Sequence, residues 1–208
     1  MGTSAGGDRS VAKTALRDQV LAARRRRPLA AAADDAEALA SVALGWEPVR
    51  RAATVAAYVS VGSEPGTGLL LDALLVAGKR VVLPVLLPDN DLDWAVYAGS
   101  ASTVRASRGL LEPAGDRLGR DAVTGADVVL VPGLAVSAAG DRLGRGGGSY
   151  DRALARVVPG TPVAVVLHDD EVGRDVPADP HDVRVGFALT PSGVVPLPES
   201  PDFSRERA

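Results

Sequence analysis

The sequence predicts an α/β fold: a single three-layer αβα domain with a mainly parallel sheet and an N-terminal helical segment. Three observations support it. The 208 residues suit one domain. Short runs of Val, Leu and Ala are typical of strands buried on both faces. These runs alternate with segments of helical periodicity. We expect the domain to span residues 10–198, with disordered tails at residues 1–9 and 199–208.

The first quarter of the chain predicts two helices before any strand. Apolar residues recur at helical spacing after Ser10, which has the side chain of an N-cap, so a helix is expected over residues 11–27. Pro28 ends this helix, and an Ala-rich helix is expected over residues 29–44. Residues 24–27 are all arginine, and we expect them to form a solvated basic face.

The remaining chain alternates strands with helices. In order, we expect a strand at 54–60, a helix at 66–77, strands at 80–86 and 93–97, an irregular segment at 98–125, a strand at 127–131, a Gly-rich loop at 132–148, a helix at 150–157, and strands at 162–167 and 185–190. Pro84 has no backbone N–H to donate, so it indicates a strand end or an edge strand.

Composition excludes several classes of function. The net charge of −3 gives no basic surface for nucleic acid. There is no cysteine, so disulfides, thiolate catalysis and Cys-ligated metal sites are excluded. No apolar run approaches the ~20 residues that span a bilayer, and the N-terminus lacks the pattern of a signal peptide. We therefore expect a cytoplasmic, monomeric protein that acts on small molecules and binds neither nucleic acid nor a membrane.

One heptapeptide, AGDRLGR, occurs twice, at residues 114–120 and 139–145. Seven residues are too few for a structural repeat. In a chain rich in Gly, Ala and Arg, coincidence or local duplication is the better interpretation. Only the second copy continues into a glycine cluster and a predicted helix.

The segment that carries chemistry runs from Val131 to Arg152, VPGLAVSAAGDRLGRGGGSYDR. It follows a buried strand, and ligands of α/β sheets bind beyond the carboxyl ends of strands. Its glycines let backbone N–H groups approach a phosphate before the next helix. Arg142 and Arg145 can donate charged hydrogen bonds to that phosphate, and Asp151 is placed to hold Mg²⁺. The loop matches neither GxxxxGK[ST] nor GxGxxG nor GxSxG, so a flexible surface loop remains the alternative.

RLGRGGGSYDR, preceded by PGLAV, resembles the nucleotide loop of the 5-formyltetrahydrofolate cyclo-ligase family. Other family landmarks resemble segments found here in the same order: Lys13-x-x-Leu16-Arg17, Tyr58–Thr67 (YVSVGSEPGT), Leu83–Pro84, Gly109–Pro113 (GLLEP) and Pro177–Val183 (PADPHDV). The resemblance covers about residues 10–190, nearly the whole chain.

The resemblance implies conversion of 5-formyltetrahydrofolate, with ATP and Mg²⁺, to 5,10-methenyltetrahydrofolate, ADP and phosphate. Phosphorylating the formyl oxygen makes it a good leaving group, and N10 can then close the ring. Such chemistry depends on positioning and charge stabilisation more than on a side-chain nucleophile. Two alternatives stay open: a non-catalytic phosphate- or nucleotide-sensing domain, and a serine hydrolase that uses Ser149 with His168 or His181.

The resemblance also implies roles for individual residues. ATP would contact Lys13, Arg17, Arg142, Leu143, Gly144, Arg145, Gly146, Gly147, Gly148, Ser149 and Tyr150. The folate would contact Val59, Glu64, Arg145, Gly148 and Ser149. The catalytic candidates are Arg145 and Tyr150, and the Mg²⁺ ligands would be Asp151 and Asp182. The alternatives are a solvated basic face for the first two cations and a dipole-favoured carboxylate at a helix N-terminus for Asp151.

The chain departs from the family pattern at three positions. Ser149 replaces the first of two tyrosines, and His168 and Glu171 stand where Phe and Gln are usual, so we expect an altered pterin or adenine pocket. Aromatic residues are few. Trp94 is the preferred candidate to stack on the pterin, with core packing as its alternative, and His181 is expected to be structural.

Overall fold

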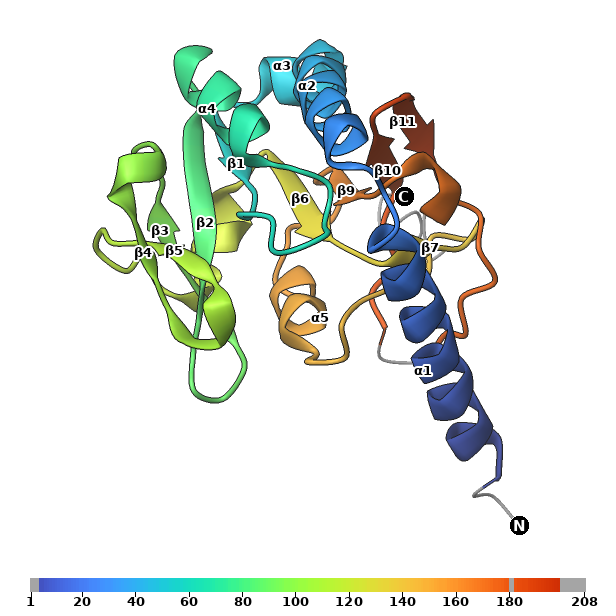
Figure 1. Ribbon diagram of the computed structural model, residues 1–208. Helices are drawn as coiled ribbons and strands as arrows, with labels where there is room; N and C mark the ends of the chain where they lie inside the picture. Colours follow the sequence, from blue (N-terminus) through green and yellow to red (C-terminus); the bar gives the residue numbers. More distant parts are fainter. Residues whose placement is uncertain (1–3, 180–181, 199–208) are drawn as a thin grey trace, which may run out of the picture.

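A seven-stranded sheet forms the centre of the computed structural model, which describes residues 4–179 and 182–198 (Figure 1). The strand order is β11-β10-β9-β6-β1-β2-β3. In that order the strands span Gly193–Pro196, Phe187–Thr190, Val163–Val166, Val128–Pro132, Thr54–Ala56, Arg80–Leu86 and Leu92–Val96. The inner strands are parallel, and the two edge strands, β3 and β11, are antiparallel to their neighbours. The predicted α/β fold with a mainly parallel sheet is confirmed.

Helices cover both faces of this sheet (Figure 1). One layer contains α2, α3 and α4, which span Leu29–Gly45, Glu47–Arg51 and Gly68–Val76. The other contains α5 (Ser149–Leu154) and the 3₁₀ helix η3 (Arg120–Gly125). Alternate side chains of β2 divide between the layers: Val81 and Leu83 pack with α2 and α4, whereas Val82 packs with α5. This alternation is the period of a strand buried on both faces.

Helix α1 spans Ser4–Arg24 and extends beyond the body of the molecule (Figure 1). It begins before Ser10, so that residue is not the N-cap, and the tail expected to be disordered over residues 1–9 is helical from Ser4. Residues 1–3 and 199–208 lie outside the described residues. Leu16 and Val20 pack on the segment from Leu134 to Leu143, in an apolar cluster separate from the two that flank the sheet. Pro28 then precedes α2, as predicted.

Short elements account for most differences from the predicted order. The five-residue α3 and the edge strand β11 were not predicted. The segment expected to be irregular contains the β4–β5 ladder, and the Gly-rich loop contains the β7–β8 ladder. The bounds are Thr103–Arg105, Leu111–Pro113, Ala135–Val136 and Arg142–Leu143 for β4, β5, β7 and β8. The remaining 3₁₀ helices, η1, η2 and η4, span Ser100–Ser102, Ser107–Gly109 and Asp169–Glu171.

The strand predicted at 54–60 is much shorter, because β1 ends at Ala56. Beyond Ala56, Pro84 of β2 pairs only with β3. On its other side β2 therefore has no paired strand of the sheet at the residue that lacks a backbone N–H group. Among residues 4–179 and 182–198, no helix is long and apolar enough to cross a membrane.

Candidate active site

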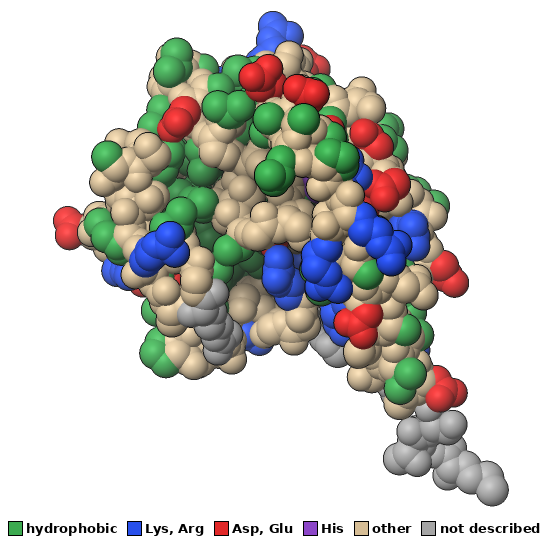
Figure 2. Space-filling model, in the orientation of Figure 1, with side chains coloured by type: hydrophobic (Ala, Val, Ile, Leu, Met, Phe, Trp, Pro, Cys, Tyr) green, Lys and Arg blue, Asp and Glu red, His purple; other side chains and the backbone are tan. Residues whose placement is uncertain are grey.

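A cavity of about 570 Å³ lies beyond the carboxyl ends of β1, β2 and β6. The chain order reverses between β1 and β6, and ligands of open α/β sheets bind at such a switch point. Figure 2 shows a hollow with hydrophobic side chains on one side and Lys and Arg side chains on the other. The predicted site residues that line the cavity are Val59, Glu64, Arg142, Gly144, Arg145, Gly146, Gly147, Gly148, Ser149, Tyr150 and Asp151.

The glycine loop, residues 144–148, connects β8 to α5 along one wall of the cavity. Gly146 and Gly148 have φ angles of +95° and +68°, a region that other residues rarely adopt. Among the described residues, no acceptor takes a hydrogen bond from the N–H groups of Gly146, Gly147 or Gly148. Helix α5 has only six residues, fewer than predicted, so its dipole is small. An anion held at this loop would therefore depend on the loop N–H groups and nearby guanidinium groups.

Arg142 holds the base of this loop. Arg142 is 7% exposed, and its Nη1 donates to the Pro132 carbonyl at 3.1 Å. Its Nη2 donates to Asp151 Oδ1 at 2.8 Å, and the guanidinium lies 5.9 Å from the centre of the Tyr150 ring. One buried cation thus fixes the end of β6, the first turn of α5 and an aromatic wall of the cavity.

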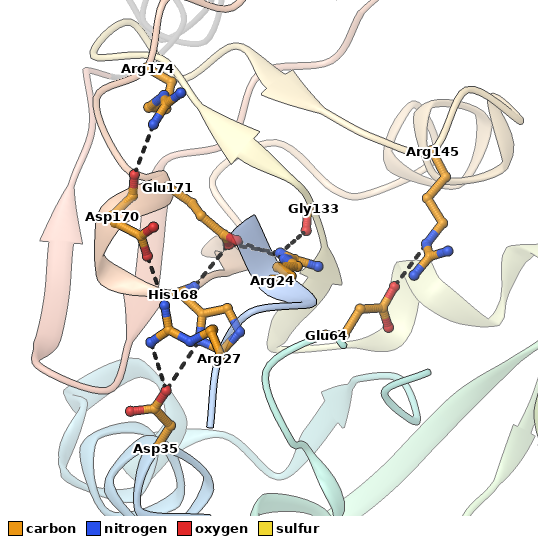
Figure 3. A network of polar contacts seen from close by, with 10 residues as sticks. All are labelled: Arg24, Arg27, Asp35, Glu64, Gly133, Arg145, His168, Asp170, Glu171 and Arg174. Atoms are coloured by element: carbon orange, nitrogen blue, oxygen red, sulfur yellow. Dashed lines mark hydrogen bonds and ion pairs between the residues drawn. The ribbon is translucent and has the colours of Figure 1, made fainter. Parts of the chain in front are cut away.

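Arg145 and Glu64 join the two loops that meet at the cavity. Arg145 Nε donates to Glu64 Oε1 at 3.1 Å (Figure 3), and Glu64 Oε2 accepts the Val61 N–H at 2.8 Å. The glutamate side chain is 6% exposed, whereas the arginine side chain is 55% exposed. The carboxylate is therefore fixed in place, and the guanidinium can turn towards a ligand without leaving solvent.

Two tyrosines line the cavity and remain protonated phenols. Burial raises the pKa of Tyr58 well above its ordinary value, and the Glu64 carboxylate raises it further. Burial and the same carboxylate also raise the pKa of Tyr150. Both hydroxyls can therefore donate hydrogen bonds at neutral pH. Trp94 does not line the cavity: it is 1% exposed and packs in the core, so the preferred stacking role is wrong and its alternative holds.

Helix α1 brings two predicted ATP contacts next to the site, although neither lines the cavity. Arg17 Nε donates to the Gly144 carbonyl at 2.9 Å. Lys13 Nζ donates to Asp179 and Asp182 at 2.6 Å each. Burial alone would lower the pKa of Lys13, but the two carboxylates raise it overall.

Leu143 is 1% exposed, and its side chain packs under α1 rather than facing the cavity. Asp182, the second predicted metal ligand, does not line the cavity and binds Lys13. Among the described residues, no group of three or more His, Cys, Asp or Glu side chains is arranged to hold a metal ion. Mg²⁺ often binds one or two carboxylates together with substrate phosphates. Asp151, beside the glycine loop, fits that requirement by itself.

Arg24 is 3% exposed, so the expectation of a solvated face is wrong at this position. It donates to both Glu171 carboxylate oxygens, at 2.6 and 2.7 Å, and to the Gly133 carbonyl at 2.8 Å (Figure 3). Arg27 also has partners, Asp35 and Asp170. The network fastens the end of α1 to the loop that follows β6.

Two of the three departures from the family pattern, His168 and Glu171, lie in this network and not in the cavity lining, whereas Ser149 lines the cavity. Burial lowers the pKa of His168, which keeps the ring neutral, and its Nδ1 lies 3.3 Å from Asp35. The hydrolase alternative therefore has no histidine beside Ser149 among the described residues. His181, expected to be structural, lies outside them.

Several lining residues were not assigned roles from the sequence: Val61, Pro84, Leu86, Leu92, Leu110, Leu111, Glu112, Pro132 and Gly133. Most are apolar residues at strand ends, where local sequence carries no signal of a cavity. Glu112 is different because it is the charged residue of this set, and it lies in GLLEP, a segment already singled out as a motif.

Comparison with known proteins gives this site a family. The model of the 5-formyltetrahydrofolate cyclo-ligase family matches residues 9–191. A 5-formyltetrahydrofolate cyclo-ligase of Mycolicibacterium smegmatis is 44% identical over 191 residues, which cover 89% of this chain and 97% of that protein. The protein of the same name from Escherichia coli K12 is 34% identical over 153 residues, covering 72% of this chain and 84% of that protein.

Two solved structures of methenyltetrahydrofolate synthetases resemble this chain. The 5,10-methenyltetrahydrofolate synthetase of Aquifex aeolicus matches with a TM-score of 0.77 and 26% identity, over 90% of this chain and 94% of that chain. The synthetase of Mycoplasma pneumoniae, at 20% identity and a TM-score of 0.68, shares the fold over 86% of this chain and 98% of that one. The chain therefore belongs to the 5-formyltetrahydrofolate cyclo-ligase family.

Proposed function

We propose that the chain uses MgATP to convert 5-formyltetrahydrofolate to 5,10-methenyltetrahydrofolate, releasing ADP and phosphate. The observation that carries the proposal is one cavity that joins a glycine loop with unused N–H groups to an apolar wall. The loop suits the phosphates of a nucleotide, and the apolar wall suits a flat ring system. The family membership of the chain supports the choice of folate.

In the first step, the formyl oxygen attacks the γ-phosphorus of ATP and ADP leaves. The loop N–H groups, Arg142 and Arg145 all belong to the cavity wall, and in this proposal they hold the phosphate oxygens on which charge is spread. Arg145 is the more mobile of the two, because its side chain is largely exposed. It can exchange its bond to Glu64 for one to the transferring group.

In the second step, N10 attacks the phosphorylated formyl carbon and loses its proton, and phosphate leaves to complete the methenyl bridge. No covalent bond to the protein is needed. Tyr58 and Tyr150 stay protonated because their pKa values are raised, so they can donate hydrogen bonds to oxygens of the reacting group. Val59 contributes to the wall against which the folate would pack.

Mg²⁺ is part of the proposal. When bound, it would neutralise phosphate charge beside the glycine loop. Asp151 would hold it, because this carboxylate lines the cavity and only its Oδ1 accepts a hydrogen bond, from Arg142, among the described residues. Asp182 is the proposed second ligand. Its Oδ2 already accepts a hydrogen bond from Lys13, so a metal held by Asp182 would compete with this cation for the carboxylate.

A direct assay tests the proposal against the phosphate-sensing alternative. Purified protein is mixed with 5-formyltetrahydrofolate, ATP and Mg²⁺, and the near-ultraviolet absorbance of the conjugated methenyl product is followed. We expect product to form only when all three components are present, with one ADP released for each product. ATP binding without product, under conditions where 5-formyltetrahydrofolate also binds, would favour the sensing domain.

A further inference from the structure

The charged residues of the cavity wall do not balance. They comprise three carboxylates, Glu64, Glu112 and Asp151, and two guanidinium groups, Arg142 and Arg145. The arginines are already paired with Asp151 and Glu64. No Lys, Arg or His of the described residues forms an ion pair with Glu112. One carboxylate of the cavity is therefore left without a cation.

Glu112 lies on β5, next to the end of β2, and the residue is only 7% exposed. Its Oε1 accepts the Leu86 N–H at 2.9 Å. Within the described part of the chain, no group donates a hydrogen bond to Oε2. The surrounding wall is apolar and includes Pro84, Leu86 and Leu111. A carboxylate buried against such a surface is costly unless donors compensate it.

We propose that Glu112 recognises the donor edge of the reduced pterin, namely its N3–H and 2-amino groups. The inference rests on the proposed function, because it takes 5-formyltetrahydrofolate as the ligand. Two neighbouring N–H donors match the two oxygens of a carboxylate. Oε2 accepts no hydrogen bond from the residues that the structure describes, and Oε1 keeps a second lone pair beside its bond to Leu86.

The position of Glu112 in the cavity would also decide which way the pterin ring points. The donor edge lies at the end of the pterin opposite the ring that carries the N5 formyl group. With that edge on Glu112 at the β2–β5 side, the flat ring packs on the apolar wall and the formyl group extends towards the glycine loop. Glu64 is then free to act near the reacting end, where its partner Arg145 belongs to the loop.

The variant Glu112→Gln separates recognition from a merely structural role. The glutamine carbonyl can still accept the Leu86 N–H, so the contact between β5 and β2 is kept. Its amide nitrogen is a donor, and it would oppose the donors of the pterin. We expect the Kd of 5-formyltetrahydrofolate to rise about 10- to 100-fold, with the Kd of ATP unchanged. Isothermal titration calorimetry measures both constants.

Asp127→Asn is the matched control. Asp127 Oδ2 also accepts backbone N–H groups, those of Ala53 and Thr54, but the residue does not line this cavity. We expect no change in folate affinity. An unchanged folate Kd in Glu112→Gln would overturn the inference and leave Glu112 as a structural link between β5 and β2.

A ligand lacking the 2-amino group tests the same contact in the unmodified protein. We expect removal of that group to weaken binding about 10-fold in wild type and less than 2-fold in Glu112→Gln, because interacting partners are not additive. Equal losses in both proteins would contradict the inference while leaving the proposed function intact. If wild type does not bind 5-formyltetrahydrofolate at all, the proposed function fails and this inference fails with it.

Discussion

The heptapeptide AGDRLGR occupies two places in the molecule and behaves differently in each. In the first copy, residues 114–120, every residue is exposed, and Arg117 forms a single bridge to Ala95 of the edge strand β3. In the second, residues 139–145, the central Asp-Arg-Leu is buried and Arg142 pairs with Val136. Both copies run antiparallel to a neighbouring strand, so the local backbone pairing is similar and the surroundings differ.

The partners of equivalent residues show what the surroundings change. Arg120 ends the first copy and binds Asp89 and Asp91, which lie in the turn between β2 and β3. Its equivalent, Arg145, binds Glu64 across the cavity. Leu118 is 37% exposed, whereas Leu143 is 1% exposed beneath α1. Identical sequence thus serves the outer edge of the sheet in one place and the candidate active site in the other.

The largest expected difference is between Arg142→Ala and Arg117→Ala. Loss of Arg142 removes a charged donor from the cavity and leaves Asp151 without its partner, so kcat/KM should fall about 10²- to 10³-fold. Arg117→Ala should retain activity within about 2-fold, because surface substitutions away from special features change little. Steady-state kinetics of the methenyl product measures both. Similar losses in the two variants would remove the distinction.

The next largest difference concerns stability. Leu143→Ala should lower the free energy of unfolding by about 3 kcal/mol, because it empties a fully buried position of β8 that packs against α1. Leu118→Ala should cost about 0.5 kcal/mol or less. Urea unfolding followed by circular dichroism gives both values. If Leu143→Ala lowered the free energy of unfolding as little as Leu118→Ala does, Leu143 would not be tightly packed against α1.

Gly147 and Gly115 offer a smaller, functional comparison. Neither has a positive φ, and an added Cβ would meet Ser149 Oγ at 3.6 Å in one case and the Val96 carbonyl at 3.8 Å in the other. Both alanine variants should therefore fold normally. Gly147→Ala should weaken ATP binding about 10-fold, because its Cβ would occupy space where backbone approaches phosphate. Gly115→Ala should bind ATP as wild type does in calorimetric titration.

The smallest expected effect is on the free energy of unfolding at low pH. It involves Asp91, which binds Arg120 of the first AGDRLGR copy. A hydrogen bond from Arg156 lowers the pKa of Asp91 from 3.8 to about 2, with Arg120 contributing. Because the folded-state pKa is depressed, this stabilisation is complete above about pH 4 and is lost as pH falls towards 2. The stability difference between wild type and Asp91→Asn should therefore shrink over that range. A constant difference in urea unfolding at pH 6, 4 and 2.5 would contradict this account.

Much of the fold followed from local patterns. Continuous Val and Leu runs predicted β2, β6 and β9 closely, because strands buried on both faces need apolar residues at every position. The short elements α3 and β11 have too few residues for a periodic signal. The early end of β1 was not predictable either, since TVAAYVS remains apolar while the chain leaves the ladder to line the cavity.

The candidate site likewise contains residues that local motifs predicted and contacts that they could not predict. The glycine loop, its arginines, Glu64 and Asp151 were singled out from motifs and do line one cavity. Their individual roles remain predictions. The pairings of Lys13 with Asp182 and of Arg24 with Glu171 join residues more than 140 positions apart. No local pattern reports such contacts, so Arg24 was expected to be solvated, and Lys13 was assigned to ATP by the family resemblance alone.

The central claim is that the second copy of AGDRLGR, together with the glycine loop that follows it, holds the nucleotide, and that the first copy does not. Hydrogen–deuterium exchange of the wild-type protein, with and without MgATP, tests it directly. The amides of residues 144–149 should exchange more slowly when MgATP is bound, because their free N–H groups would then donate to phosphate. Those of residues 117–121 should not change. Equal protection of both segments, or protection of the first copy alone, would contradict the claim.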